Sequence, residues 1–242
     1  INEIEKPSVK PNDVLVEVKA ASLNPIDYKI AEGHLKEMLP LKLPSTIGFD
    51  VSGVVVDKGA DVNNFEIGDE IYSRVPQEQM GTVAEFVTIN SDKVAKKPAN
   101  ISFEEASGLP LTGLTAIQAL EKAGIKEDDR ILIHAGSGGV GSLAIQYAKA
   151  KGAIVYTTTS SKNADWVKAL GADRVIDYKT EDYKVVANNL DIVFDTLGDD
   201  YTFEAFEIIK DGGKVTTIMG PPDEETAKKK WGLKIINYPN NY

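Results

Sequence analysis

From Arg130 to Met219 the sequence alternates short apolar runs with segments of helical periodicity. A parallel strand that is buried on both faces is a near-continuous apolar run, and a helical crossover leads to the next strand. We therefore expect a doubly wound α/β domain built on a parallel sheet. The expected strands are RILIHA, AIVYTT, RVIDY, DIVFDT and KVTTIM, and the expected helices are VGSLAIQYAKAKG, NADWVKALG, a short acidic stretch after Tyr178, and TFEAFEIIKDG.

The first hundred residues have a different pattern. Val14, Val16 and Val18 alternate with other side chains in residues 13–23, which predicts a half-buried strand. Residues 47–59, 66–75 and 82–98 contain further short strand signals, and such strands suggest a barrel or sandwich. Residues 24–33 predict one short helix, because Asn could cap it, Pro stands at its first position and Gly follows its end.

The two patterns meet near residue 100, so we expect one domain at 1–100 and a second at 101–242. Ser102 and Glu105 have the spacing of a capping box at the start of a helical segment that runs to Gly124. Pro110 is expected to kink or divide that segment.

Charge and composition exclude several classes of function. The formal net charge of −10 argues against a nucleic-acid partner, because phosphate binding needs clustered Lys and Arg. No apolar run approaches the roughly 18 residues of a membrane span. The chain has no cysteine and only two histidines, His34 and His134, so we expect no zinc site. Nothing indicates an oxidising compartment, and a cytoplasmic location is the default expectation.

A glycine motif lies between the first and second parts of the α/β pattern. Gly136, Gly138 and Gly141 have the spacing G-x-G-x-x-G, directly after a predicted strand and at the start of a predicted helix. In this context the glycines allow a tight turn, close approach of a pyrophosphate, and close packing of the helix on the strand. The start of the helix also offers backbone N–H groups to an anion. The motif predicts a dinucleotide site, and the alternative is a glycine-rich turn that only packs.

The loop after the next predicted strand indicates which dinucleotide. An NAD site would place Asp or Glu about 20 residues after the glycines, to accept hydrogen bonds from the ribose. Here Thr157, Thr158 and Thr159 lead into Ser160, Ser161 and Lys162, and the first acid is Asp165. Hydroxyls and an ammonium would hold a 2′-phosphate, which a carboxylate would repel. The loop therefore predicts NADP(H), and the alternative is a solvated turn whose lysine binds nothing.

Motifs along nearly the whole chain resemble those of a known family. They are AASLNPIDYKIAEG, PSTIGFDVSGVV, FEIGDEIYSRV, GTVAEFVTI, LPLTGLTAIQAL, IHAGSGGVGSLAIQYAKAKGA, LGADRVIDY and VFDTLGD. In this order they resemble the zinc-independent medium-chain dehydrogenases/reductases, in the quinone oxidoreductase and enone (alkenal) reductase branch. The resemblance implies an N-terminal GroES-like β-barrel domain and a C-terminal Rossmann domain. It also implies that the chain lacks an N-terminal strand and the final C-terminal portion of such proteins.

The resemblance further implies roles for individual residues. Gly139, Val140 and Gly141 resemble residues that hold the pyrophosphate, and Asn163 joins Ser160, Ser161 and Lys162 in the 2′-phosphate loop. Tyr178 resembles the tyrosine beside the adenosine ribose. Expected near the nicotinamide or its ribose are Asn24, Thr112, Leu197, Gly198, Met219 and Gly220.

The implied activity is zinc-free, NADPH-dependent reduction of the C=C bond of α,β-unsaturated carbonyls, or of quinones. Negative charge gathers on the carbonyl oxygen in such a reaction, and a proton must later reach the α-carbon. Tyr28 and Lys29 are the candidate catalytic residues, with water as an alternative proton donor. The rival hypothesis is a non-catalytic NADP(H)-binding protein of the same fold that acts as a redox sensor or structural partner. The resemblance also implies a homodimer.

Overall fold

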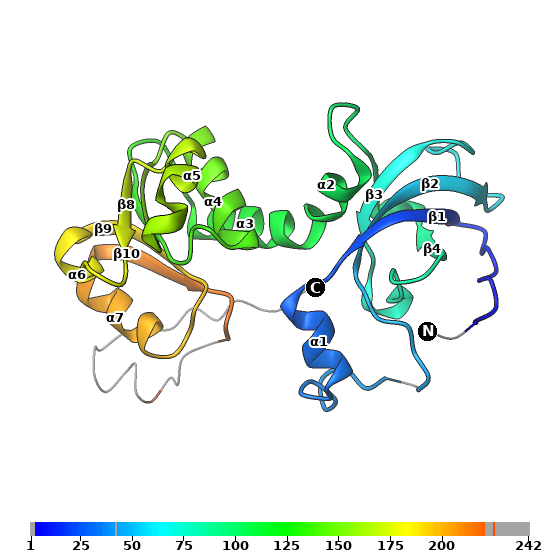
Figure 1. The fold of residues 1–242 in the computed structure, drawn as a ribbon, viewed down its shortest axis with the longest axis horizontal. Coiled ribbons are helices and arrows are strands. Elements are labelled where there is room, and N and C mark those ends of the chain that lie inside the picture. The colour runs from blue at the N-terminus through cyan, green and yellow to red at the C-terminus, as the bar shows by residue number, and fades with distance from the viewer. Residues whose placement is uncertain (1–2, 42, 221–224, 226–242) are drawn as a thin grey trace. The chain divides into compact units, whose positions relative to one another are not determined.

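The computed structural model describes residues 3–41, 43–220 and 225, and the chain divides into two compact units between Leu111 and Thr112 (Figure 1). The division falls later than the domain boundary expected near residue 100, because helix α2 (Phe103–Ser107) packs on the strands of the first unit. The Ser52 hydroxyl on one of those strands donates to the carbonyl of Phe103 at 2.5 Å. No helix among the described residues is long and apolar enough to cross a membrane.

The first unit contains a five-stranded antiparallel sheet with the strand order β4-β1-β2-β3-β5. Val14 and Val16 are buried in its core and Val18 packs against it, as the alternation predicts. Two register shifts in the pairing of β1 with β2, after Leu15 and after Val18, interrupt the regular ladder. The strands are β1 (Asp13–Ser22), β2 (Asp50–Lys58), β3 (Glu70–Arg74), β4 (Phe86–Asn90) and β5 (Val94–Lys96), with 3₁₀ turns at Gln77–Gln79 and Ser91–Lys93.

Helix boundaries around the first unit follow the local signals. Helix α1 (Pro25–Ala31) begins with Pro at its first position, and the Asn24 N–H donates to the carboxylate of Asp27 at 2.7 Å. The predicted capping box of α2 is confirmed: the Glu105 N–H donates to the Ser102 hydroxyl at 3.1 Å, and the Ser102 N–H donates to Glu105 at 2.8 Å. Pro110 divides the predicted segment as expected, because α3 (Pro110–Ala123) begins at it.

The second unit has the predicted parallel sheet, with the strand order β10-β9-β6-β7-β8. Chain order runs outward in one direction from β6 through β7 to β8, and in the other from β9 to β10. The order therefore reverses between β6 and β9. The elements are β6 (Arg130–Ile133), α4 (Gly139–Ala150), β7 (Ile154–Thr159), a 3₁₀ turn η3 (Ser161–Asn163), α5 (Ala164–Ala169), β8 (Arg174–Asp177), α6 (Tyr183–Val186), β9 (Leu190–Asp195), α7 (Asp200–Ile208) and β10 (Ile209–Thr217).

Helices cover both faces of this sheet, as the apolar strands predict (Figure 1). Ile131 and Ile133 of β6 pack in the cluster that includes α3, α4 and α5, whereas Leu132 between them packs in the cluster with α6 and α7. Alternate residues of a strand point to opposite faces, so one four-residue strand contributes to both layers.

The structure corrects one predicted helix. The pattern extended the last helix to Gly212, but α7 ends at Ile208 and β10 begins at Ile209. Ile209 pairs with Leu190, and regular pairing resumes only at Lys214 with Ile192. Between them Gly212 adopts a φ of 77°, a conformation that favours glycine. Pairing to β9 therefore outweighs helical periodicity here.

Candidate nucleotide-binding site

The predicted nucleotide-binding residues of the second unit follow the carboxyl ends of its five strands. In an open α/β sheet, the loops on either side of the point where strand order reverses leave a crevice at that edge, and ligands bind there. Here the reversal lies between β6 and β9. The residues are Gly136 and Gly138 after β6, Ser160 to Asn163 after β7, Tyr178 after β8, Leu197 and Gly198 after β9, and Met219 and Gly220 after β10.

Packing inside the protein requires glycine at two positions of the motif, whether or not a ligand binds. A Cβ on Gly136 would lie 2.0 Å from the Thr157 hydroxyl and 2.9 Å from the Ile145 side chain. A Cβ on Gly141 would lie 2.4 Å from the Ala135 carbonyl oxygen, so this glycine lets α4 begin directly on the loop. Their spacing therefore has a structural cause that does not involve a ligand.

Packing does not require glycine at position 138 in the same way. A Cβ there would have one neighbour within 4 Å among the described residues, the Ala135 carbonyl oxygen at 3.3 Å. Its φ of −83° is open to any residue. The N–H groups of Gly139, Val140 and Gly141 begin α4 and have no acceptor within the helix, and the capping glycine offers no side chain to them. These donors beside open space are suited to bind an anion.

The loop before α4 is held in an unusual conformation. Ala135 has a φ of 51°, which side-chain-bearing residues seldom adopt. Its N–H donates to the Thr158 hydroxyl at 3.1 Å, and the Gly136 N–H donates to the Thr158 carbonyl at 2.9 Å. Strand β7 therefore fixes the shape of the glycine loop.

A second link joins the loop to the turn after β7. The Ser137 hydroxyl accepts from the Thr159 hydroxyl at 2.9 Å and from the Asn163 side-chain amide at 3.1 Å. Our prediction had placed Asn163 in the phosphate loop and had assigned Ser137 no role. The only signal in the sequence was a serine between the glycines.

The structure corrects the interpretation of the three threonines. Thr157, Thr158 and Thr159 are at most 4% exposed, and their hydroxyls bond to the neighbouring strand and the glycine loop. They are not available to a phosphate, because β7 continues through Thr159. Ser161 and Lys162 in η3 are exposed, and Lys162 forms no ion pair with any residue that the structure describes.

An acidic side chain does lie next to this turn. Asp177, the last residue of β8, accepts a hydrogen bond from the Ser161 N–H at 3.2 Å and another from the Lys179 N–H at 3.1 Å. Tyr178 follows it and is 55% exposed. Sequence spacing missed Asp177 because it comes from the neighbouring strand. Since its two oxygens accept from backbone N–H groups, the carboxylate shapes the turn.

The turn after β9 is built on a buried acid. Asp195 is completely buried, and its Oδ1 accepts from the N–H groups of Leu197 at 2.8 Å and Gly198 at 3.0 Å. Its other oxygen accepts from the Thr202 hydroxyl. Gly198 has a φ of 80°, and a Cβ on it would lie 2.8 Å from Met219. Two predicted site segments, from β9 and β10, are therefore in contact.

Beneath the glycine loop lies a buried histidine. His134 is 0% exposed, its Nδ1 is 3.3 Å from the Thr158 hydroxyl, and its Nε2 has no partner among the described residues. The ring makes edge contacts with Tyr183 at 4.9 Å and Tyr201 at 5.2 Å between ring centroids. Burial lowers the pKa of His134 to about 4, against the opposing effect of Asp195. His134 therefore packs inside the second unit and braces the Thr158 side chain.

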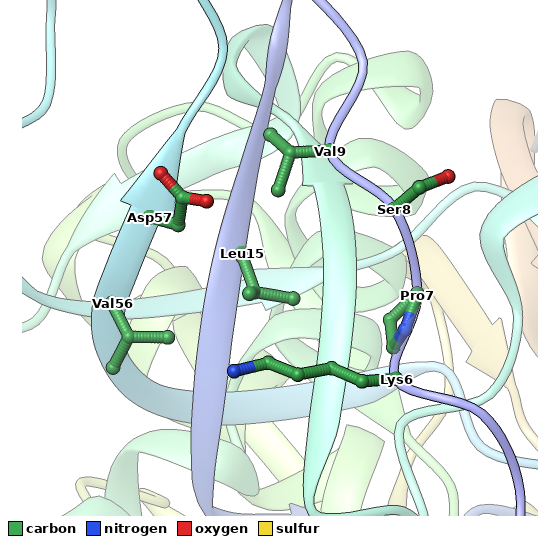
Figure 2. Close-up of a pocket in the computed structure, with 7 residues that line it drawn as sticks. All are labelled: Lys6, Pro7, Ser8, Val9, Leu15, Val56 and Asp57. Atoms are coloured by element: carbon green, nitrogen blue, oxygen red, sulfur yellow. The ribbon is translucent and has the colours of Figure 1, made fainter.

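The other predicted residues lie on helices. Thr112 in α3 sits 3.1 Å from where a Cβ of Gly139 would be, so it packs against the start of α4. In the first unit, Asn24 is buried, whereas Tyr28 in α1 is 53% exposed and Lys29 is half-buried. Figure 2 shows a hollow elsewhere in that unit, beside Lys6 and Asp57, and its lining includes none of the predicted residues.

The residues do not fit a catalytic zinc ion. The sequence has no cysteine, His34 is exposed and paired with Glu32 at 3.0 Å, and His134 is enclosed in the second unit. The described part of the chain contains no cluster of three His, Cys, Asp or Glu side chains able to hold a metal ion.

Comparison with known proteins identifies both units. Residues 10–99 match the family described as alcohol dehydrogenase GroES-like domain, and residues 139–237 match the family described as zinc-binding dehydrogenase. The NADPH-dependent alkenal/one oxidoreductase of Arabidopsis thaliana is 39% identical to this chain over 90% of its residues. The match spans only 58% of the length of that relative. The chloroplast envelope quinone oxidoreductase homolog of the same plant is 37% identical, with 91% of the chain and 70% of that protein covered.

A solved structure agrees with these relatives. The quinone oxidoreductase of Coxiella burnetii is 42% identical and superimposes with a TM-score of 0.82, over 88% of this chain and 68% of that one. The two matched domains, the strand order and the glycine loop all agree with the resemblance seen in the sequence. The chain therefore belongs to the medium-chain dehydrogenase/reductase family, in its quinone oxidoreductase and enone reductase branch.

Proposed function

We propose that the protein is an NADPH-dependent oxidoreductase that reduces the C=C bond of α,β-unsaturated carbonyls, or quinones, without zinc. One observation carries this proposal: the first N–H groups of α4, which have no acceptor among the described residues, lie beside Gly138 at the edge of the sheet where strand order reverses. The names of the relatives, an alkenal/one oxidoreductase and quinone oxidoreductases, support the substrate class.

The cofactor would supply a hydride, and the chain's residues would hold and orient it. We propose that the first turn of α4 binds the pyrophosphate with Gly139, Val140 and Gly141. Ser161 and Lys162 would bind the 2′-phosphate, because both are exposed at the carboxyl end of β7 and the lysine is a cation without an ion-pair partner among the described residues. Ser160 stands at the N-cap position of that turn without a side-chain cap hydrogen bond and is only 9% exposed, and Asn163 ties the turn to the glycine loop.

Further contacts would extend along the same edge of the sheet. Exposed Tyr178 offers a ring for the adenosine ribose, and the backbone turns at Leu197–Gly198 and Met219–Gly220 would meet the nicotinamide side. Thr112 packs on the start of α4 and would border the same region.

In the first unit, Asn24, Tyr28 and Lys29 are the proposed residues on the substrate side. A phenol or an ammonium can stabilise a carbonyl oxygen as it becomes negative, and can then give a proton to the product. Tyr28 is exposed enough to meet a ligand without rearrangement of the core, and Lys29 is its neighbour on α1.

The experiment is a spectrophotometric assay of the full-length protein with NADPH, followed at 340 nm, with a short-chain enone and with a benzoquinone as separate substrates. We expect oxidation of NADPH that depends on the added substrate and persists with a metal chelator present. Tight binding of NADPH without turnover on either substrate would instead support the non-catalytic alternative.

The homodimer and the cytoplasmic location also remain proposals. The homodimer comes from the family resemblance, and light scattering of the full-length protein would test it. Two plant relatives have the chloroplast in their names, so fluorescence imaging of the tagged full-length protein is the test of the location.

A further inference from the structure

The first unit contains a buried carboxylate directly behind the predicted substrate side. Asp50, the first residue of β2, is 0% exposed. Its Oδ2 accepts from the Asn24 side-chain amide at 2.9 Å and from the Ser22 hydroxyl at 3.1 Å, and its Oδ1 accepts from the Leu111 N–H at 3.0 Å. A buried charge is costly unless each oxygen has donors, and here both oxygens have them.

These contacts determine which way the Asn24 amide points. A side-chain amide has a donor end and an acceptor end. The carboxylate of Asp50 can only accept, so it binds the nitrogen, Nδ2. The carbonyl oxygen is then the other end; it faces the Asp27 N–H in the capping box of α1, and its second lone pair can accept a hydrogen bond from a ligand. A neutral amide at position 50 would not impose this choice.

We propose that Asp50 is a positioning residue for the reaction, whose carboxylate holds the Asn24 amide with its carbonyl oxygen available to the substrate. The inference rests on the proposed function, because it requires a ligand next to Asn24. It adds Asp50, a residue without a predicted role, to the proposed site.

The charges around Asp50 make its ionisation measurable. Burial raises the pKa of Asp50 to about 6, the hydrogen bonds from Asn24, Ser22 and Leu111 oppose this rise, and the nearby Asp27 carboxylate adds to it. Arg74 pairs with Asp50 in the sheet register, and its positive charge acts on Asp27. These two groups, Asp27 from α1 and Arg74 from β3, are the charged groups of the described residues that face this site.

The substitution Asp50→Asn tests the proposal because it keeps the size of the side chain and exchanges the acceptor that faces Asn24 for a donor. The Leu111 N–H is fixed in the backbone and still donates to the one side-chain oxygen left at position 50. The NH2 end of the new amide then faces Asn24. The Asn24 amide therefore turns over and presents Nδ2 to the ligand. We expect kcat to fall roughly tenfold to a hundredfold, because a misplaced group costs this much. The KM for NADPH should change less than about twofold, since its phosphates would bind the other unit.

Two further variants make this result specific. Asp57→Asn removes an exposed carboxylate from the same strand and should leave kcat unchanged. In an Asn24→Ala background, Asp50→Asn should cause no further loss of kcat, because Asp50 acts through Asn24. Unchanged kcat in the single variant, or independent losses that multiply in the double variant, would overturn the proposal. A wild-type protein that reduces no enone or quinone would instead refute the proposed function.

A measurement on the unmodified protein covers the case in which Asp50→Asn does not fold. In protein labelled with ¹⁵N-asparagine, the Asn24 side-chain signals, assigned by their loss in Asn24→Ala, should shift with a midpoint near the pKa of Asp50, about 6. Side-chain signals of Asn24 that stay constant from pH 8 to 5 would show that the carboxylate does not hold the amide.

Discussion

Alanine substitutions at two glycines of the loop should separate the needs of the fold from those of the ligand. At Gly141 the added Cβ would lie 2.4 Å from the Ala135 carbonyl oxygen and 2.9 Å from the Gly136 Cα, both backbone atoms. Real contacts under 3.0 Å are essentially absent, so the start of α4 must move by about 0.6 Å. At Gly138 the nearest atom among the described residues is the Ala135 carbonyl oxygen at 3.3 Å, and φ is −83°, so the methyl group requires that oxygen to move by only a few tenths of an ångström.

The magnitudes follow from these distances. Overpacking against backbone costs about 3 kcal/mol or more, and the better helix propensity of Ala returns about 1 kcal/mol, so Gly141→Ala should destabilise the protein by about 2 kcal/mol. That loss corresponds to a decrease in Tm of roughly 5–10 °C for a unit of this size. Gly138→Ala loses a favoured N-cap and should cost less than about 1 kcal/mol. Its methyl group, however, occupies the space that we assign to the pyrophosphate.

Thermal unfolding and titration of NADPH fluorescence measure the two effects. We expect Gly141→Ala to melt early, and Gly138→Ala to melt close to wild type while binding NADPH at least tenfold more weakly. Wild-type affinity in Gly138→Ala would refute the assignment of the open space to the cofactor. Wild-type stability in Gly141→Ala would refute the packing argument for the third glycine.

The remaining predictions concern three other parts of the molecule. Lys162→Glu should weaken NADPH binding about tenfold to a hundredfold and NADH binding much less, by calorimetry, whereas equal losses would mean that the lysine does not contact the 2′-phosphate. His134 stays neutral in the fold with a pKa of about 4, below its ordinary 6.5, so it contributes stability above pH 6.5 that is lost as the pH falls to 4. The stability difference between wild type and His134→Gln should therefore shrink by about 3 kcal/mol over that range in urea unfolding, and a difference that stays constant would refute the argument. Tyr28→Phe and Lys29→Met should separate the candidate proton donors by kcat, with a loss of about a hundredfold in the variant that lacks the donor, and no loss in either would assign the proton to water.

Local signals account for most of the fold that was predicted. The capping box at Ser102, the division at Pro110 and the alternation along β1 depend on near neighbours, and each was confirmed. The strand at Ile209 was missed because its helical periodicity is overridden by pairing with Leu190, a residue 19 positions earlier that only the sheet brings alongside.

The glycine loop shows how far the sequence determines a site. Spacing alone located the loop between a strand and a helix, because the motif G-x-G-x-x-G is typical of that junction. Tertiary contacts decided which of these glycines packing requires and which it does not. Thr157 comes alongside Gly136 only because β7 pairs with β6, whereas a Cβ on Gly138 would meet only the Ala135 carbonyl oxygen among the described residues.

The amino-acid sequence by itself determined the α/β pattern, the family and the position of the glycine loop, since periodicity and motif spacing act over a few residues. Tertiary structure decided which polar side chains belong to the interior. The threonines of β7 form hydrogen bonds that hold the glycine loop and the neighbouring strand. Asp177 and Asp50 accept hydrogen bonds from groups on other elements. The reason is physical: burying a polar group is costly without a partner, and its partner is chosen by strand pairing and packing rather than by sequence distance.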